Sequence, residues 1–172
     1  MVEIAPGAAL TLPPAPGYPG SFEAVQTLVA SHEGRVQAFE AVVHADEATA
    51  TVLLTMVNGP RLMEIVWDAS GISETRSSLT PDSLSALNIL ADIVLANWPE
   101  AQVQAALPPG IKVEDNAGSR TIVSGDVILV EISAPAPAPN GRSRRTLRNL
   151  SRGYELTITS SNVAAGPDGF LP

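Results

Sequence analysis

Two histidines, His32 and His44, are the side chains of this 172-residue chain that could carry protons at neutral pH. Carboxylates at Glu33, Asp46 and Glu47 stand close enough in the sequence to help one of them hold a metal ion. The spacings HxH and HExxH, which zinc enzymes use, do not occur. We therefore expect both histidines to be surface residues, with no catalytic residue, no metal ion and no cofactor.

Other reactive groups are equally sparse. The chain has no cysteine, which excludes disulfides and thiol nucleophiles. The nucleophile motif GxSxG, the dinucleotide motif GxGxxG and the Walker phosphate loop are absent, and the acidic residues are scattered singly. The sequence therefore predicts a protein that is not an enzyme.

The charge distribution bears on possible partners. A formal net charge of −8 argues against nucleic acid as a ligand. Five of the ten basic residues nevertheless fall within residues 142–152, which contain no acid: Arg142, Arg144, Arg145, Arg148 and Arg152. Two interpretations stay open, a patch for an anionic partner or lipid and an edge strand whose charges prevent aggregation.

Composition indicates one domain with an aliphatic core, since 45% of the residues are hydrophobic and only 4% are aromatic. Residues 1–20 lack the basic and apolar regions of a signal peptide, and their Pro/Gly/Ala content predicts a linker that is unable to pack. We expect the folded domain to span residues 21–160 and residues 161–172 to form a flexible tail.

Strands are predicted wherever apolar and polar residues alternate between turn signals. Glu33-Gly34 and Asn58-Gly59-Pro60 are the clearest turns. The expected strands are residues 22–32, 35–44, 48–57, 61–67, a short one after Gly71, 111–113, 120–124, 126–132, 146–150 and 154–160. A Pro-broken loop is expected at residues 134–141.

One helix interrupts the strands. We expect it to begin at Thr80-Pro81-Asp82, where Thr80 can cap and Pro81 suits the first helical position. Its apolar residues recur at three and four positions and cover most of the circumference, which indicates burial on more than one side. Pro99 ends this helix, and one or two further helical turns run to Leu107.

Together these elements predict a mainly β fold with α. Five strands, a helix and five strands, joined by short links, favour an antiparallel meander that curls around the helix. The strands and the helix carry more apolar surface than one sheet face and one helix must bury. That excess is typical of an aliphatic cavity or of a dimer interface, and a well-filled core also remains open.

The order of motifs over residues 24–160 resembles a known family, the uncharacterised LolB-like outer-membrane lipoproteins whose genes often accompany aryl-polyene genes in Gram-negative bacteria. The resemblance is carried by QTLVASHEGRVQAFEAVVHADEATATVLL, RLMEIVWD, ADIVLANWP, ALPPGIKV, GSRTIVSGDVILVEI and TLRNLSRGYELTIT. It implies the LolA/LolB-like fold, an open, unclosed antiparallel half-barrel of about ten or eleven strands with a central helical lid over a lipid-holding cavity.

The same resemblance implies a location and partners. It suggests a periplasmic lipoprotein held at the inner leaflet of the outer membrane by a lipid anchor, whose signal peptide and lipidated cysteine would precede Met1. A LolA-like periplasmic carrier is the implied protein partner. The turn that would contact the membrane comprises Val57, Asn58, Gly59 and Leu62, and Asn58 stands where LolB has an exposed leucine.

Our leading hypothesis from the sequence is a non-enzymatic protein that binds or transfers a lipid or an acylated ligand. The alternative is a tethered interaction module, without a ligand cavity, that recruits a biosynthetic or export partner. The predicted cavity residues are Val52, Leu54, Met56, Met63, Ile65, Trp67, Ile128, Val130, Leu156 and Ile158, lidded by Leu87, Leu90, Val94 and Trp98.

Overall fold

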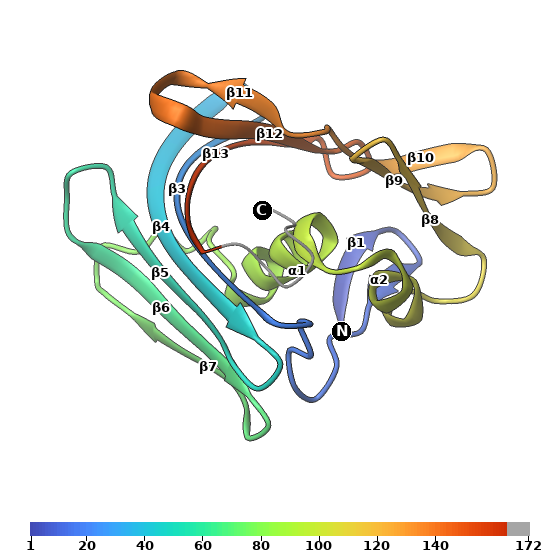
Figure 1. Ribbon diagram of the computed structural model, residues 1–172, viewed down its shortest axis with the longest axis horizontal. Helices are drawn as coiled ribbons and strands as arrows, with labels where there is room; N and C mark the ends of the chain where they lie inside the picture. Colours follow the sequence, from blue (N-terminus) through green and yellow to red (C-terminus); the bar gives the residue numbers. More distant parts are fainter. Residues whose placement is uncertain (165–172) are drawn as a thin grey trace.

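The computed structural model describes residues 1–164 and is dominated by a strongly curved sheet (Figure 1). Five strands precede the helices: β3 (Ser21–His32), β4 (Arg35–Asp46), β5 (Ala50–Met56), β6 (Arg61–Asp68) and β7 (Gly71–Arg76). The helices are α1 (Ala86–Asn97) and α2 (Glu100–Ala106). After them come β8 (Ile111–Asn116), β9 (Ser119–Ser124), β10 (Val127–Ile132), β11 (Ala136–Ala138), the 3-10 turn η1 (Pro139–Gly141), β12 (Arg142–Asn149) and β13 (Tyr154–Ala164).

The sheet contains eleven strands in the order β7-β6-β5-β4-β3-β13-β12-β10-β9-β8, with β11 added on β12. Every pairing is antiparallel, and β7 and β8 are the two ends of the path, so the sheet is open. The predicted mainly β, open antiparallel meander is confirmed. Its two halves are joined by the pairing of β3 with β13.

A two-residue turn determines the register of the longest hairpin, formed by β3 and β4. Glu33 and Gly34, between β3 and β4, both have positive φ, at 50° and 76°. This is the backbone of a tight two-residue turn whose twist matches that of the flanking strands. The register then keeps Leu28 opposite Phe39 and Gln26 opposite Ala41, which places all four side chains on the concave face.

Alternation along the strands gives the concave face its apolar character. Val52 and Leu54 on β5, and Met63 and Ile65 on β6, are at most 2% exposed. The intervening Leu53 is half-buried on the outer face. Helix α1 lies across the concave face (Figure 1), so the sheet curls around it as the sequence pattern predicts.

Helix α1 begins five residues later than predicted. Ser85, not Thr80, is its N-cap, and the Ser85 hydroxyl accepts a hydrogen bond from the Asn88 N–H. Thr80 instead donates its hydroxyl to the Leu62 carbonyl. The Arg76 guanidinium donates to the Pro81 and Leu84 carbonyls, which holds residues 81–84 as a turn. These tertiary contacts outweigh the local helix signal.

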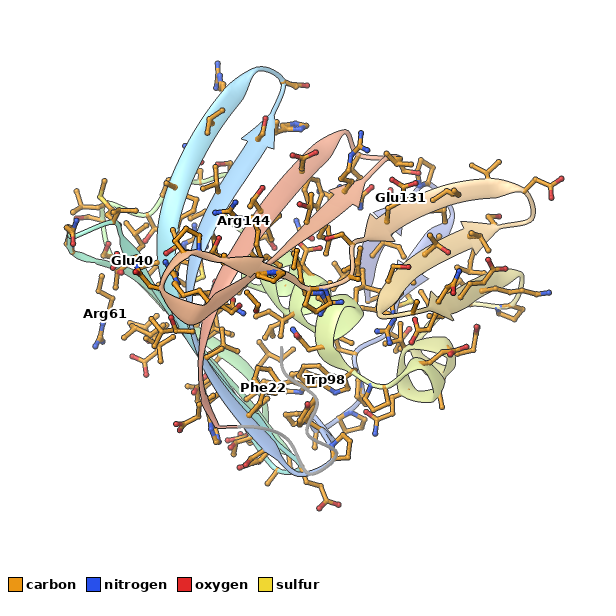
Figure 2. All side chains as sticks on the ribbon, turned by 45° about the horizontal axis from the view of Figure 1, so that its top comes forward. Phe22, Glu40, Arg61, Trp98, Glu131 and Arg144 are labelled. Carbon is orange, nitrogen blue, oxygen red and sulfur yellow. The ribbon has the colours of Figure 1, made fainter. Side chains whose placement is uncertain are left out.

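An aromatic cluster closes one end of the core. Trp98, the residue after α1, stacks on Trp67 with ring centroids 6.2 Å apart and an interplanar angle of 18°. Phe22 and Tyr18 meet Trp98 edge-on, and Figure 2 shows Phe22 and Trp98 side by side. The Trp98 indole donates a 2.7 Å hydrogen bond to the Pro16 carbonyl. The segment before β3 is therefore part of the core.

The prediction that residues 1–20 form a linker unable to pack is wrong. Strands β1 (Val2–Ala5) and β2 (Ala8–Leu10) form a hairpin, and β1 contacts α1. Leu10 is fully buried and Ile4 is 3% exposed. The Asn149 side-chain amide donates to the Ile4 carbonyl at 3.0 Å. This short apolar alternation lies among prolines and glycines, and its packing depends on residues distant in the sequence.

The C-terminal boundary and the 134–141 loop also differ from the prediction. β13 continues to Ala164, so the expected tail starts within a strand, and residues 165–172 lie outside the described part. β11 forms inside the expected loop and pairs with β12, with Ala136 opposite Arg144. β12 consequently starts at Arg142, four residues earlier than predicted, and takes in most of the arginine cluster.

Candidate functional site: a cavity between α1 and the sheet

A cavity of about 440 Å³ lies between α1 and the concave face of the sheet. This volume is within the range of about 300–1,000 Å³ that small-molecule sites occupy. Most of its wall is apolar and comes from β3, β4, β5, β13 and α1. The apolar lining comprises Leu28, Ala30, Phe39, Ala41, Val43, Val52, Leu54, Leu84, Ile89, Ile93, Ala96, Leu156 and Ile158.

The structure brings together only part of the predicted cavity residues. Four of them line the cavity: Val52, Leu54, Leu156 and Ile158. Seven are buried in solid core away from it: Met63, Ile65, Trp67, Leu90, Val94, Trp98 and Val130. Met56, Leu87 and Ile128 are 46%, 41% and 39% exposed and do not line it either. For these ten residues the predicted cavity placement is wrong.

The orientation of α1 explains why Leu87, Leu90 and Val94 do not line the cavity. The most apolar stripe of the helix, which includes Leu90, Val94 and Leu95, is at most 2% exposed and packs into the core. The opposite, half-polar stripe faces the cavity, with Ile89 and Ile93 set among polar residues. Asn88 and Asp92, which are four positions apart, interrupt the apolar pattern directly before these isoleucines. These two polar residues are the feature of the sequence that marks the face of α1 bordering the cavity.

A polar group of residues lies where β3, β4 and β13 meet at one end of the cavity. The Tyr154 hydroxyl donates a 2.6 Å hydrogen bond to the Asp92 carboxylate. The Arg152 guanidinium lies 5.8 Å from the centroid of the Tyr154 ring. His32 and Arg35 belong to the same end of the lining and are exposed to solvent. We call Arg35, Asp92, Arg152 and Tyr154 the mouth cluster.

The mouth cluster shifts two ionisation equilibria. Burial raises the pKa of the Asp92 carboxyl to about 6, against the opposing effects of the Tyr154 hydrogen bond and the Arg152 charge. Burial and the adjacent Asp92 charge raise the pKa of the Tyr154 phenol, so it remains a hydrogen-bond donor at neutral pH. The cavity mouth therefore carries a carboxyl group that changes charge near pH 6.

The raised pKa of Asp92 predicts that the stability of the protein depends on pH. Its folded pKa, about 6, lies above its ordinary 3.8, so the folded protein retains a proton that the unfolded chain has lost. The stabilising contribution is complete below pH 3.8 and is lost as the pH rises through 6. Asp92→Asn cannot ionise, so its unfolding free energy relative to the original protein should rise by about 2 kcal/mol between pH 4 and pH 7.5. This value is smaller than the full pKa shift implies, because the carboxyl is partly accessible to solvent.

Urea unfolding of both proteins at pH 4, 5, 6 and 7.5 measures this difference. Tyr154→Phe, which removes the hydrogen bond and leaves the carboxyl, is the matched control and should keep the pH dependence. A difference between Asp92→Asn and the original protein that stays constant from pH 4 to pH 7.5 would contradict the prediction.

Two arginines lie against the C-terminus of α1, and one of them, Arg145, lines the other end of the cavity. Arg145 lines the cavity, is 5% exposed, and donates to the Ala96 carbonyl at 2.8 Å and the Ser133 carbonyl at 3.2 Å. Arg120 donates to the Leu95 and Trp98 carbonyls at 2.7 and 2.8 Å. Both cations satisfy carbonyls at the negative end of the helix dipole.

Only one of these two arginines has a carboxylate partner. Arg120 forms a bidentate pair with Asp115, at 2.6 and 2.8 Å. No carboxylate of residues 1–164 forms an ion pair with Arg145. Burial, together with the charge of Arg120, lowers the pKa of the Arg145 guanidinium to about 10, and it stays charged at neutral pH.

Alternation along β12 divides the predicted anionic-partner patch, because Arg145 lies on the concave face and Arg142, Arg144 and Arg148 lie on the other face. Arg145 faces the cavity and the exposed Arg144 points away from it. Arg148 lies on the outer face near the carboxylates of Glu131 and Glu155. The remaining two are tied to other parts of the fold: Arg142 donates to Thr27 and to the Thr159 carbonyl, and Arg152 belongs to the mouth cluster.

The predicted membrane-contact turn is partly exposed. Val57, Asn58 and Gly59 lie at the exposed tip between β5 and β6, and Asn58 has a positive φ of 52°. Leu62 is only 1% exposed and packs into the core, so its expected place at the tip is wrong. Neither helix within residues 1–164 is long and apolar enough to cross a bilayer.

The two histidines have separate surroundings and do not contact each other. The ring of His32 is exposed at the β3–β4 turn, with Nδ1 3.1 Å from the Gly153 carbonyl. His44 lies on the outer face of β4, 3.2 Å from an Asp46 carboxylate oxygen and 3.4 Å from a Glu23 oxygen. No group of side chains in residues 1–164 is arranged to hold a metal ion.

Comparison with known proteins places this cavity-bearing domain in a family. A comparison with curated proteins finds no match. Residues 23–162 match the family described as "Protein of unknown function (DUF3261)", and this range contains every strand from β4 to β12 and both helices. Because the match covers most of the chain and all the sheet residues that line the cavity, the protein belongs to the DUF3261 family.

Proposed function

We propose that this protein is a non-enzymatic carrier that holds an acyl chain in the cavity between α1 and the sheet. The observation that carries the proposal is the cavity itself, about 440 Å³ in volume with a wall made mostly of aliphatic side chains. Each methylene moved from water into such a site contributes about 0.8 kcal/mol. A chain of a dozen carbons therefore offsets the loss of translational and rotational freedom on binding.

The polar ends of the cavity favour an amphiphile over a purely apolar ligand. The mouth cluster offers hydrogen-bond donors beside solvent, and Asn97 and Gln26 line the wall farther along α1 and β3. An acyl chain along the aliphatic wall would leave a polar group at one of these ends. This arrangement is typical of sites in which apolar surface supplies affinity and a few polar groups fix orientation.

We also propose that the protein is a LolB-like lipoprotein of the outer membrane that acts in the periplasm. The sequence resemblance supports this, and an open antiparallel sheet with a helix on its concave face is compatible with it. In this proposal a lipid anchor ahead of the described domain holds it at the inner leaflet, and a LolA-like carrier exchanges ligand with it.

Neutral alcohols test the carrier proposal without involving charge. We expect n-alkanols from octanol to tetradecanol to bind with dissociation constants that fall up to about fourfold per methylene, then level off once the cavity is full. Isothermal titration calorimetry gives the constants, and a negative heat-capacity change marks burial of apolar surface. Affinity that does not depend on chain length would contradict an acyl-binding cavity.

The natural ligand can be sought directly. Mass spectrometry of an organic extract, from protein expressed in a Gram-negative host and purified without detergent, would identify a bound amphiphile and its stoichiometry. A blank extract, repeated after incubation with lipid vesicles, would count against the carrier function.

A blank extract would favour the second candidate function, a tethered module that recruits a protein partner. The observation in its favour is an apolar strip on the outer face of β3 and β4. Val25 and Val42, which are opposite each other in the register, are 42% and 49% exposed, and Val29 and Val36 are 36% and 66% exposed. Exposed apolar strips of this kind are common at protein contacts.

A further inference from the structure

Arg145 lines the cavity, is 5% exposed and forms no direct ion pair in residues 1–164, although the charge of Asp115 acts on it from a greater distance. A guanidinium has five N–H donors, and two carbonyls, those of Ala96 and Ser133, accept from it. Its Nη2 nitrogen donates to no acceptor in residues 1–164 and is accessible from the cavity, since it is not among the fully buried atoms that lack a partner. A ligand anion that reaches this nitrogen would form a charge-assisted hydrogen bond with a largely desolvated cation.

The neighbouring Arg120 differs from Arg145 in having a direct carboxylate partner. Arg120, next to the same helix end, has its own carboxylate, Asp115, in a bidentate pair. Asp115 forms its direct hydrogen bonds with Arg120 and none with Arg145. The two guanidiniums repel each other, which adds to the need for an anion on the unpaired one.

The charged side chains that line the cavity carry a net positive charge, the same sign as Arg145. Three arginines, Arg35, Arg145 and Arg152, line the cavity against two carboxylates, Glu33 and Asp92. The protein as a whole carries a net charge of −8. The cavity is therefore a region of positive charge in an acidic protein, and of these three cations Arg145 is the deeply buried one.

We propose that the cavity binds a long-chain carboxylate, whose head group pairs with the Arg145 guanidinium and whose chain lies along the aliphatic wall. Planar carboxylate and guanidinium groups match in geometry and form short, charge-assisted hydrogen bonds. The chain would run from Arg145 past Ile158 and Leu28, which are opposite each other in the β13–β3 register and both line the cavity. This inference rests on the acyl-carrier function proposed above and adds the chemical class and orientation of the ligand.

Dodecanoate and dodecanol, compared by calorimetry at pH 8, provide the test, because they share a chain and differ in the head group. We expect dodecanoate to bind at least tenfold more tightly to the original protein. Arg145→Gln should reduce that ratio to below threefold while dodecanol affinity stays within threefold. Arg144→Gln, which changes the exposed neighbour on the same strand, is the matched control and should leave the ratio unchanged.

Two results would overturn the proposal. One is equal binding of the acid and the alcohol by the original protein, a measurement that needs no folded variant. The other is a preference for the acid that survives Arg145→Gln. If that surviving preference disappears in the double variant Arg35→Gln/Arg152→Gln, the carboxylate binds at the mouth. Failure of both ligands to bind would instead reject the acyl-carrier function itself.

Discussion

Ile89→Trp is expected to lower dodecanol affinity at least about thirtyfold, because an indole at this position occupies the space that the ligand chain needs. Ile89 is half-buried on the face of α1 that lines the cavity. Displacing three methylenes from the aliphatic wall removes about 2.4 kcal/mol of binding free energy. Calorimetry with dodecanol measures the loss.

The matched control is Leu87→Trp, two residues earlier on the same helix. Leu87 is 41% exposed and does not line the cavity, so its replacement should leave affinity within about threefold. Thermal melts of both variants separate ligand exclusion from unfolding. Equal affinity of the Ile89→Trp protein and the original would refute the location of the site, and a loss confined to Leu87→Trp would restore the helix face predicted from the sequence.

Arg120→Met is expected to cost about 3–5 kcal/mol of unfolding free energy, a large part of the stability of a domain of this size. The substitution leaves the Asp115 carboxylate without its bidentate partner and the Leu95 and Trp98 carbonyls without donors. All these groups lie at the C-terminus of α1, where the chain turns into α2. Urea unfolding followed by circular dichroism measures the change.

An exposed ion pair provides the comparison for Arg120. Arg61 and Glu64 lie 3.1 Å apart on the surface of β6, and Arg61→Met should cost no more than about 1 kcal/mol. If Arg120→Met cost as little as Arg61→Met, the helix terminus would not depend on the buried guanidinium.

Strands and turns could be predicted from the sequence because their signals are local. The alternation of Val52, Leu54 and Met56 with threonines and Leu53 fixes which residues share a face, and Glu33-Gly34 fixes a two-residue turn. The open antiparallel meander follows from short links between such strands. These features depend on residues within a few positions of one another.

What the sequence did not reveal depends on contacts between distant residues. The start of α1 depends on Arg76 and Thr80 bonding to carbonyls that local propensity does not consider. β1 contacts α1 in the structure, whereas the sequence predicts a linker in its place. Arg145 was recognised only as one member of a charged run, since its inward direction required the true start of β12 at Arg142.

The pairing of β3 with β13 has a consequence for the order in which the protein folds. Gln26 and Ser160, which bond across this seam, are 134 positions apart in the chain. Contacts of such high sequence separation form late, because the entropy of closing the intervening loop must be overcome first. We therefore expect the cavity wall that Leu28 shares with Ile158 to form late in folding. Until then one edge of β3 is unpaired, and such an edge can pair with another chain and aggregate.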